Sequence, residues 1–191
     1  MRGRVRAERR QDNREERREV RRTGEPRVRP TRYRMRQRVV AFGDDFDIEN
    51  SAGQKVFHVD GKMLRIRDTL IFRDMQGNEL LRIQERIVRI KDTMSIDSPQ
   101  GQVLAVVKKA LITPLRDRWT VKIGDGPDLE VQGSVLDHEY NIGEGPNLVA
   151  EISKKWFRIR DTYGVSIRPG QNDILILAIS VAVDMMAHPG R

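Results

Sequence analysis

An uninterrupted apolar run near the C-terminus limits the folds open to this chain of 191 residues more than any other feature. Residues 174–183 read ILILAISVAV, in which Ser180 is the one polar side chain. The run is too long and too apolar for a single strand. As a helix it has no polar stripe, so it must be buried on every side. Asn172 or Asp173 can cap its first turn, and we expect a helix over about 173–187.

A closed β-barrel threaded by this helix satisfies the burial requirement. Fifteen helical residues span only ~22 Å, less than the ~30 Å hydrocarbon core of a bilayer, which disfavours a membrane span. A closed barrel leaves no sheet edge unpaired and encloses the helix completely. Asp184 is the exception on the helix. We expect it near the barrel mouth, capped by an inward Arg or by water, because a buried unpaired carboxylate is costly.

The rest of the chain repeats itself at an offset of 24 residues. Gly53, Gly77 and Gly101 coincide, and each closes a turn in the strings NSAG, DMQG and SPQG. Each unit reads as two strands of about 12 residues, so residues 39–171 supply roughly ten to twelve strands. We therefore predict a mainly β protein: a closed antiparallel barrel of about twelve strands around a buried hydrophobic C-terminal α-helix, preceded by a disordered Arg-rich tail.

A basic pentapeptide occurs three times, as RIRDT at 65–69, RIKDT at 89–93 and RIRDT at 158–162. Apolar and cationic residues alternate in it, which is typical of a strand with one apolar and one cationic face. Asp–Thr then interrupts the alternation, and we expect a turn or bulge there. If these strands are neighbours, their cations form a patch that holds phosphate head groups. The candidate anion- or lipid-binding residues are Arg65, Arg67, Arg89, Lys91, Arg158 and Arg160.

The alternative for these cations is a solvated face on which they pair with nearby acids. Glu79, Glu85 and Asp97 are the acids that the spacing makes available. The charge of the body favours this pairing, because beyond residue 38 the chain has 20 basic and 22 acidic residues.

The N-terminal segment accounts for the positive charge of the chain. Residues 1–38 hold 16 Arg and 6 Asp or Glu, and few apolar side chains. We predict that 1–38 is a disordered basic tail and that 39–187 is the barrel with its helix. Arg32, Arg34, Arg36 and Arg38 are assigned to the electrostatic surface of the tail.

No motif for catalysis or metal binding emerges from the sequence. There is no Cys, and His58, His138 and His188 are far apart. The acidic string DDFDIEN at 44–50 lacks the Gly and the final Glu of a calcium-binding loop, so an ordinary strand with acids facing water is the better interpretation. We expect no catalytic residue, no metal, no cofactor and no enzymatic activity, although a site assembled from distant strands, with His138 or Asp184 lining a polar pocket, stays an alternative.

The aromatic residues allow two interpretations. Trp119, Trp156, Phe157 and Tyr163 could stack on nucleic-acid bases, but most stand at strand positions suited to a core. We expect core packing for them.

Four strings together resemble the LURP-one-related family. They cover residues 32–62, 74–86, 137–167 and 174–184, and the most specific combination is DHEY, VAEISKKWF and DTYGV followed by the apolar helix. The family shares its fold with the tubby C-terminal domain and the phospholipid scramblases. The resemblance implies a twelve-stranded barrel around a C-terminal helix. It implies no agreed reaction for bacterial members, links plant relatives to defence, and links tubby and scramblase relatives to membrane lipids.

The function expected from these features is a non-enzymatic intracellular barrel that docks on anionic phospholipid head groups or acts as a scaffold. One alternative is a tail-mediated contact with nucleic acid or another polyanion, or a scaffold for protein interactions. Another is a barrel that binds a small molecule or acts like a hydrolase. We expect a monomeric cytoplasmic protein that can lie peripherally on the inner face of the membrane.

Overall fold

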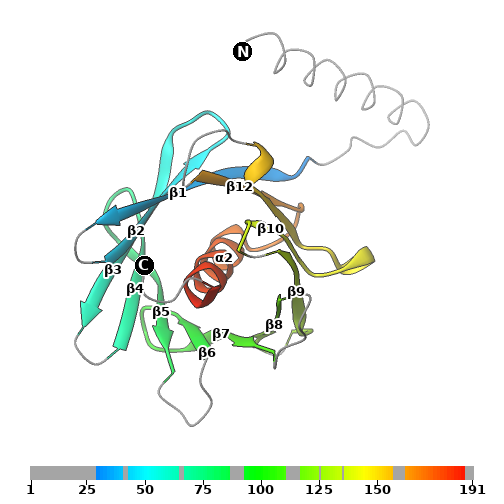
Figure 1. Ribbon diagram of the computed structural model, residues 1–191. Helices are drawn as coiled ribbons and strands as arrows, with labels where there is room; N and C mark the ends of the chain where they lie inside the picture. Colours follow the sequence, from blue (N-terminus) through cyan, green and yellow to red (C-terminus); the bar gives the residue numbers. More distant parts are fainter. Residues whose placement is uncertain are drawn as a thin grey trace. The chain divides into compact units, whose positions relative to one another are not determined.

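The chain folds into a twelve-stranded closed barrel with one helix inside it, as predicted (Figure 1). The structure is a computed structural model that describes residues 29–40, 43–64, 67–86, 93–110, 117–124, 126–134, 136–156 and 162–187. Within the strands, only the backbone is described at 37–40, 43–44, 62–64, 67–68 and 117. The strands are β1 (Thr31–Val40), β2 (Gly43–Asn50), β3 (Lys55–Leu64), β4 (Arg67–Asp74), β5 (Glu79–Glu85), β6 (Thr93–Asp97), β7 (Val103–Lys109), β8 (Asp117–Ile123), β9 (Leu129–Ser134), β10 (Glu139–Ile142), β11 (Ala150–Ser153) and β12 (Thr162–Ile167).

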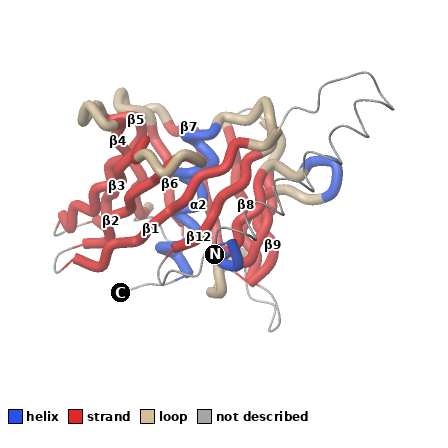
Figure 2. The backbone as a smooth tube through the Cα atoms, turned by 90° about the horizontal axis from the view of Figure 1, so that it is seen from above, coloured by secondary structure: helices blue, strands red, loops and turns tan. Residues whose placement is uncertain are grey.

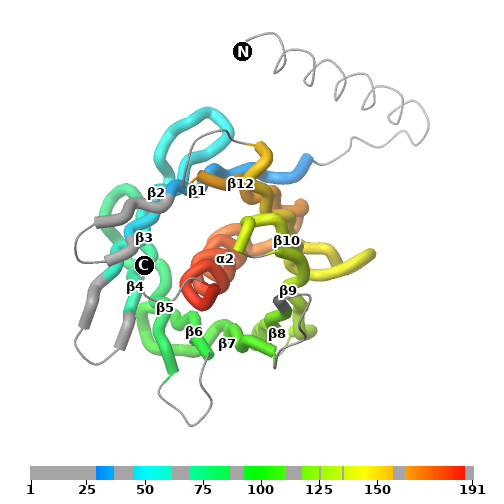
Figure 3. The backbone as a smooth tube through the Cα atoms, in the orientation of Figure 1, coloured from blue at the N-terminus to red at the C-terminus, as the bar shows by residue number. Residues whose placement is uncertain are grey.

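Each strand pairs antiparallel with its neighbours in the chain, and β1 closes the barrel by pairing with β12. The closing register runs from Thr31 opposite Ile167 to Arg36 opposite Thr162. Two short 3₁₀ helices interrupt the strands: η1 (Gly145–Asn147) between β10 and β11, and η2 (Lys154–Trp156) after β11. The tube in Figure 3 follows this sequential winding around the helix.

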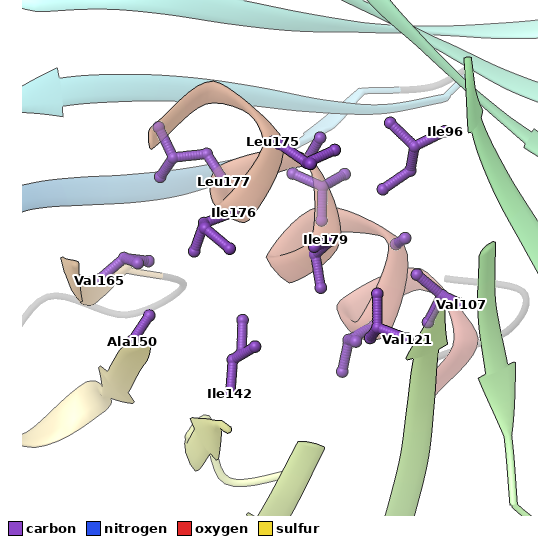
Figure 4. Packing of buried hydrophobic residues seen from close by; sticks show 14 of the residues in the cluster. Ile96, Val107, Val121, Ile142, Ala150, Val165, Leu175, Ile176, Leu177 and Ile179 are labelled. Atoms are coloured by element: carbon purple, nitrogen blue, oxygen red, sulfur yellow. The ribbon is translucent and has the colours of Figure 1, made fainter. Parts of the chain in front are cut away.

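The helix α2 (Asp173–Ala187) fills the interior of the barrel. Asn172 caps it as expected, because its side-chain oxygen accepts a hydrogen bond from the Leu175 N–H at 3.1 Å. Every residue from Leu175 to Asp184 is buried. Figure 4 shows strand side chains meeting the helix from both sides, with Ile96, Val107 and Val121 on one side and Ile142, Ala150 and Val165 on the other.

Three hairpins account for the 24-residue repeat. In each, a Gly with positive φ donates its N–H to the carbonyl of the residue three positions earlier, and the ladder shifts register beside the turn. A type I turn followed by a left-handed Gly gives this geometry in three-residue hairpin loops. The pairs are Gly53–Asn50 at 2.9 Å, Gly77–Asp74 at 3.1 Å and Gly101–Ser98 at 2.9 Å. The prediction that these glycines close turns is confirmed.

The predicted start of the barrel at residue 39 was eight residues too late, since β1 begins at Thr31. Met35 of this strand is completely buried, and Tyr33 packs against the core beside it. Arg34, which lies between them, is on the other face of the strand and pairs with Glu49. An Arg-rich strand with few apolar residues has the composition of a disordered tail, and only its pairing with β2 and β12 distinguishes the two.

The predicted turn at Asp–Thr of the first pentapeptide was also misplaced. β3 ends at Leu64, β4 begins at Arg67, and these two residues are paired across the hairpin. Asp68 and Thr69 therefore lie inside β4, opposite Met63 and Lys62. The ladder of backbone hydrogen bonds continues through the change in side-chain polarity, so polarity alone did not locate the turn.

Candidate functional site

The two rims of the barrel differ in what they carry. The hairpin loops β2–β3, β4–β5 and β6–β7 lie at one rim, at the top of Figure 2. At the other rim β9 ends at Ser134, β11 ends at Ser153 and α2 ends at Ala187. We call this second rim the helix-end rim. In a barrel whose strands follow the chain order, every connection from an odd strand to the next even strand belongs to this rim.

The six predicted anion-binding residues fall largely outside the described part of the chain. Arg65, Arg89, Lys91, Arg158 and Arg160 lie outside the described residues, and Arg67 is the first residue of β4, where only the backbone is described. Their sequence positions nevertheless fall within or beside the β3–β4, β5–β6 and β11–β12 connections. All three of these are odd-to-even connections, so they join strand ends at the helix-end rim.

The arginines assigned to the tail belong to strand β1 instead. Arg34 forms an ion pair with Glu49 of β2 at 2.5 Å. Arg36 and Arg38 stand opposite Asp47 and Asp45 in the β1–β2 register. Acids of the string DDFDIEN thus stand opposite arginines of β1 in the strand register. Cross-strand pairs of opposite charge stabilise a sheet modestly, by roughly 0.2–1 kcal/mol each.

Asp47 does not face open water, contrary to the expectation for this strand. It is only 4% exposed, and its carboxylate contacts Lys55 Nζ at 2.9 Å and His58 Nδ1 at 3.2 Å. Asp45 accepts a hydrogen bond from the Gly61 N–H at 3.0 Å. Across the described residues, no three His, Asp or Glu side chains converge as metal ligands would.

Two of the three acids that were expected to pair with the basic pentapeptides, Glu79 and Asp97, have other described contacts. Glu79 forms an ion pair with Arg82 at 2.7 Å on the same strand. Asp97 accepts a hydrogen bond from the Ser95 hydroxyl at 3.2 Å.

Glu139 organises the short helix η2 at the helix-end rim. Its carboxylate accepts hydrogen bonds from the backbone N–H groups of Lys154 at 3.0 Å and Lys155 at 3.1 Å, and from the Ser153 hydroxyl at 3.0 Å. The Lys155 ammonium lies 3.2 Å from the same carboxylate. Partial burial opposes ionisation of Glu139, but the hydrogen bonds from Lys155 and Ser153 and the charge of Lys155 outweigh it and lower the pKa. The carboxylate thereby holds η2 against β10.

Two large apolar side chains are exposed beside this contact. Trp156 is 40% exposed and Leu136 is 58% exposed. The Lys154 N–H donates to the His138 carbonyl at 3.1 Å. In the sequence, Trp156 follows Lys154 by two positions and Leu136 precedes His138 by two positions. The Arg32 guanidinium is 6.0 Å from the centre of the Trp156 ring. The expectation of core packing is therefore wrong for Trp156, whereas Trp119 and Tyr163 are each 1% exposed; Phe157 lies outside the described residues.

A buried ionisable pair joins the same rim to the helix. His138 Nδ1 lies 3.1 Å from the Asp184 carboxylate, and the two residues are 6% and 1% exposed. Asp184 was expected to find an Arg or water, and the structure gives it His138. His138 has a φ of 50°, a left-handed conformation that is uncommon for residues other than Gly but that His, like Asn and Asp, adopts more often than most. Its ring stacks on Tyr163, with centroids 4.5 Å apart and planes 10° apart.

Two tyrosines share this enclosed region. The Tyr140 hydroxyl lies 3.5 Å from the Ser180 carbonyl, while the Tyr163 hydroxyl is buried and has no hydrogen-bond partner in the described residues. Burial and the nearby charge of Asp184 raise the pKa of both phenols well above the ordinary value. Both phenols are therefore neutral at pH 7. The His138–Asp184 pair lies enclosed between the turn and the helix, where it fixes one to the other.

The sequence identifies the family. The profile of the family described as LURP-one-related matches residues 31–184. The chain belongs to the LURP-one-related family. The resemblance noted from the sequence is therefore confirmed, and the match begins where β1 begins.

One relative and one solved structure resemble the chain over most of its length. The chain is 25% identical to the Bacillus subtilis (strain 168) protein YxjI, described as uncharacterised, over 154 residues that cover 81% of this chain and 92% of the relative. An X-ray structure of a protein from Arabidopsis thaliana superposes with a TM-score of 0.61 at 21% identity, covering 83% of this chain and 93% of the other. At that identity the second comparison shows the shared fold. In the part of the chain that the structure describes, no helix combines the length and apolarity needed to cross a bilayer.

Proposed function

We propose that this LURP-one-related barrel docks on membranes that carry anionic phospholipids and serves there as a non-catalytic scaffold. The observation that carries the proposal is the strand order. The described strand ends on either side of the β3–β4, β5–β6 and β11–β12 connections lie at one rim, and the sequence between or beside these ends contains Arg65, Arg89, Lys91, Arg158 and Arg160. Several cations on one rim can meet a planar layer of phosphates at once, whereas cations spread around a barrel wall cannot.

The N-terminal segment supplies additional attraction. Residues 1–30 hold 12 Arg and 6 Asp or Glu, so this segment keeps a net charge of +6 after the arginines of β1 are assigned to the barrel. Near an anionic leaflet each basic residue contributes on the order of 1 kcal/mol, which the acids of the segment reduce. The segment therefore provides long-range attraction, and the rim provides the oriented contact.

Vesicle co-sedimentation at near-physiological salt tests the proposal. The full chain and residues 29–191, which retain every strand and the helix, are compared on neutral, anionic and phosphoinositide-containing vesicles. We expect both chains to bind anionic vesicles, and the full chain to bind more tightly.

Two double variants distinguish binding through the cations of the helix-end rim from attraction by the overall charge of the chain. Arg89→Gln with Lys91→Gln removes two cations from an odd-to-even connection and should weaken binding. Lys122→Gln with Arg168→Gln removes two exposed cations near the C-terminal ends of β8 and β12, at the rim opposite the helix-end rim. This second variant should bind vesicles as tightly as the unchanged chain. If only the full chain binds, in proportion to charge and equally to nucleic acid, the tail is a general polyanion contact and the barrel does not dock.

A further inference from the structure

The helix-end rim also exposes an apolar surface that fits the interfacial layer of a bilayer. We infer that Trp156 and Leu136 insert at the boundary between head groups and acyl chains while the neighbouring cations contact lipid phosphates. This inference rests on the proposed function and names the surface that carries it. We call the surface the Trp156 patch; it comprises Leu136, Lys154, Lys155 and Trp156 at the helix-end rim, together with the guanidinium of Arg32, which reaches the indole from the start of β1.

The patch combines the two properties that such an insertion needs. Indole rings favour the membrane interface because an apolar body joins a polar N–H, and Trp156 is 40% exposed. Leu136 adds a second exposed apolar side chain on the neighbouring turn. Singly exposed apolar residues are common on protein surfaces, but here two of them flank one backbone hydrogen bond.

The charges around the patch favour an anionic surface. Lys154 is exposed, the Lys155 side chain is 81% exposed, and the Arg32 guanidinium lies over the indole. The nearby acid Glu139 directs its carboxylate toward the backbone of η2, and Asp137 accepts a hydrogen bond from Ser134. Both carboxylates are engaged in local contacts, that of Glu139 also with the Lys155 ammonium at 3.2 Å, while Lys154 is exposed and the Lys155 side chain stays largely accessible to solvent.

The patch is also held in place rather than carried on a free loop. Glu139 fixes the two lysine N–H groups of η2, and the His138 carbonyl accepts from Lys154. His138 is in turn anchored to the end of α2 through Asp184. A surface that is organised before binding loses less conformational entropy when it meets the membrane.

Intrinsic fluorescence tests the inference directly, because the chain has only two tryptophans and Trp119 is 1% exposed in the core. The full chain is titrated with vesicles of phosphatidylcholine and phosphatidylserine, with bromine placed at defined depths along the acyl chains. We expect a blue shift and quenching that is strongest for bromines near the head groups. Trp156→Phe should abolish both signals and leave the Trp119 emission unchanged.

Binding measurements with matched variants supply the second readout. Trp156 is 40% exposed, which corresponds to about 60 Å² if an aromatic side chain buries ~150 Å². Trp156→Ala removes the transfer of this apolar area into the interface and should weaken vesicle partitioning about tenfold. Leu136→Ala should weaken it by a smaller factor. Met75→Ala is the matched control, since Met75 is 51% exposed in the β4–β5 loop at the opposite rim, and it should leave partitioning unchanged.

The outcomes separate the inference from the function on which it rests. Vesicle binding without quenching of Trp156, and with no loss in Trp156→Ala or Leu136→Ala, overturns the patch and leaves membrane docking intact. Absence of binding by the full chain to every vesicle overturns both. Binding that Trp156→Ala and Met75→Ala weaken equally also refutes the patch, because the effect is then not specific to this rim.

Discussion

Deletion of residues 1–38 should open the barrel, whereas deletion of residues 1–28 should leave it closed. The longer deletion removes most of β1, the strand that pairs with both β2 and β12. The shorter deletion ends at residue 28, before β1 starts at Thr31, so all twelve strands remain. The two chains differ by only ten residues, which makes the comparison a direct test of the closing strand.

The magnitude follows from what β1 contributes. Met35 is completely buried, and removing a buried Met side chain costs about 2–5 kcal/mol. Tyr33 donates a hydrogen bond to the Asp173 carboxylate at 2.8 Å, which adds about 1 kcal/mol. The backbone ladders to two neighbouring strands are lost as well. The total is at least about 5 kcal/mol, which is comparable with the whole stability of an ordinary domain.

Thermal unfolding followed by circular dichroism measures the effect. Residues 29–191 should melt cooperatively near the temperature of the full chain. Residues 39–191 should melt at least ~10 °C lower or without a cooperative transition. Within the full chain, Met35→Ala should cost about 2–5 kcal/mol, and Arg36→Ala, on the exposed face of the same strand, should cost little. A 39–191 chain that melts like the 29–191 chain would show that β1 does not close the barrel.

Three further substitutions test the enclosed polar region and the rim. Asp184→Ala leaves His138 without its buried partner and should destabilise the fold by about 3–5 kcal/mol in urea titrations, while adding His138→Asn should recover part of the loss. Tyr163→Phe removes a buried hydroxyl that has no hydrogen-bond partner among the described residues, so stability at pH 7 should stay equal or rise. Because the pKa of Tyr163 is raised in the fold, the wild-type chain should lose stability above pH ~10, and the variant should lose less. Glu139 has a lowered pKa, so its contribution is present above its ordinary pKa and is lost as pH falls; Glu139→Gln should flatten the decline of unfolding free energy between pH 7 and pH 3.

The core of the fold was predictable because it depends on patterns that are local in the sequence. The apolar run at 174–183 required enclosure, and the 24-residue spacing of Gly53, Gly77 and Gly101 marked three equivalent hairpins. These signals fix strand number and closure without knowledge of any distant contact. The first strand escaped detection because its stabilising partners, the acids of β2, lie in a different segment and neutralise its arginines only after pairing.

The candidate surface was less predictable because it depends on residues brought together by the barrel. Trp156 occupies a position beside β11 that suggested a core residue, but η2 turns the chain so that the ring faces solvent. His138 and Asp184 are separated by 46 positions, and nothing in the sequence pairs them. One signal was available: an apolar helix with a single acid near its end must find that acid a buried partner, and few side chains other than His, Arg and Lys can serve.

The buried pair and the exposed patch form one continuous chain of contacts, and this gives their variants different signatures. Asp184 contacts His138, the His138 carbonyl accepts from Lys154, and Lys154 begins the short helix that ends at Trp156. A change at Asp184 should therefore lower stability and vesicle binding together, because it releases the turn that supports η2. A change at Trp156 should lower vesicle binding alone, because nothing in the core rests on its exposed face. If Asp184→Asn lost stability while binding vesicles normally at a temperature where it is folded, the helix end would not position the patch, and the patch would depend on Glu139 alone.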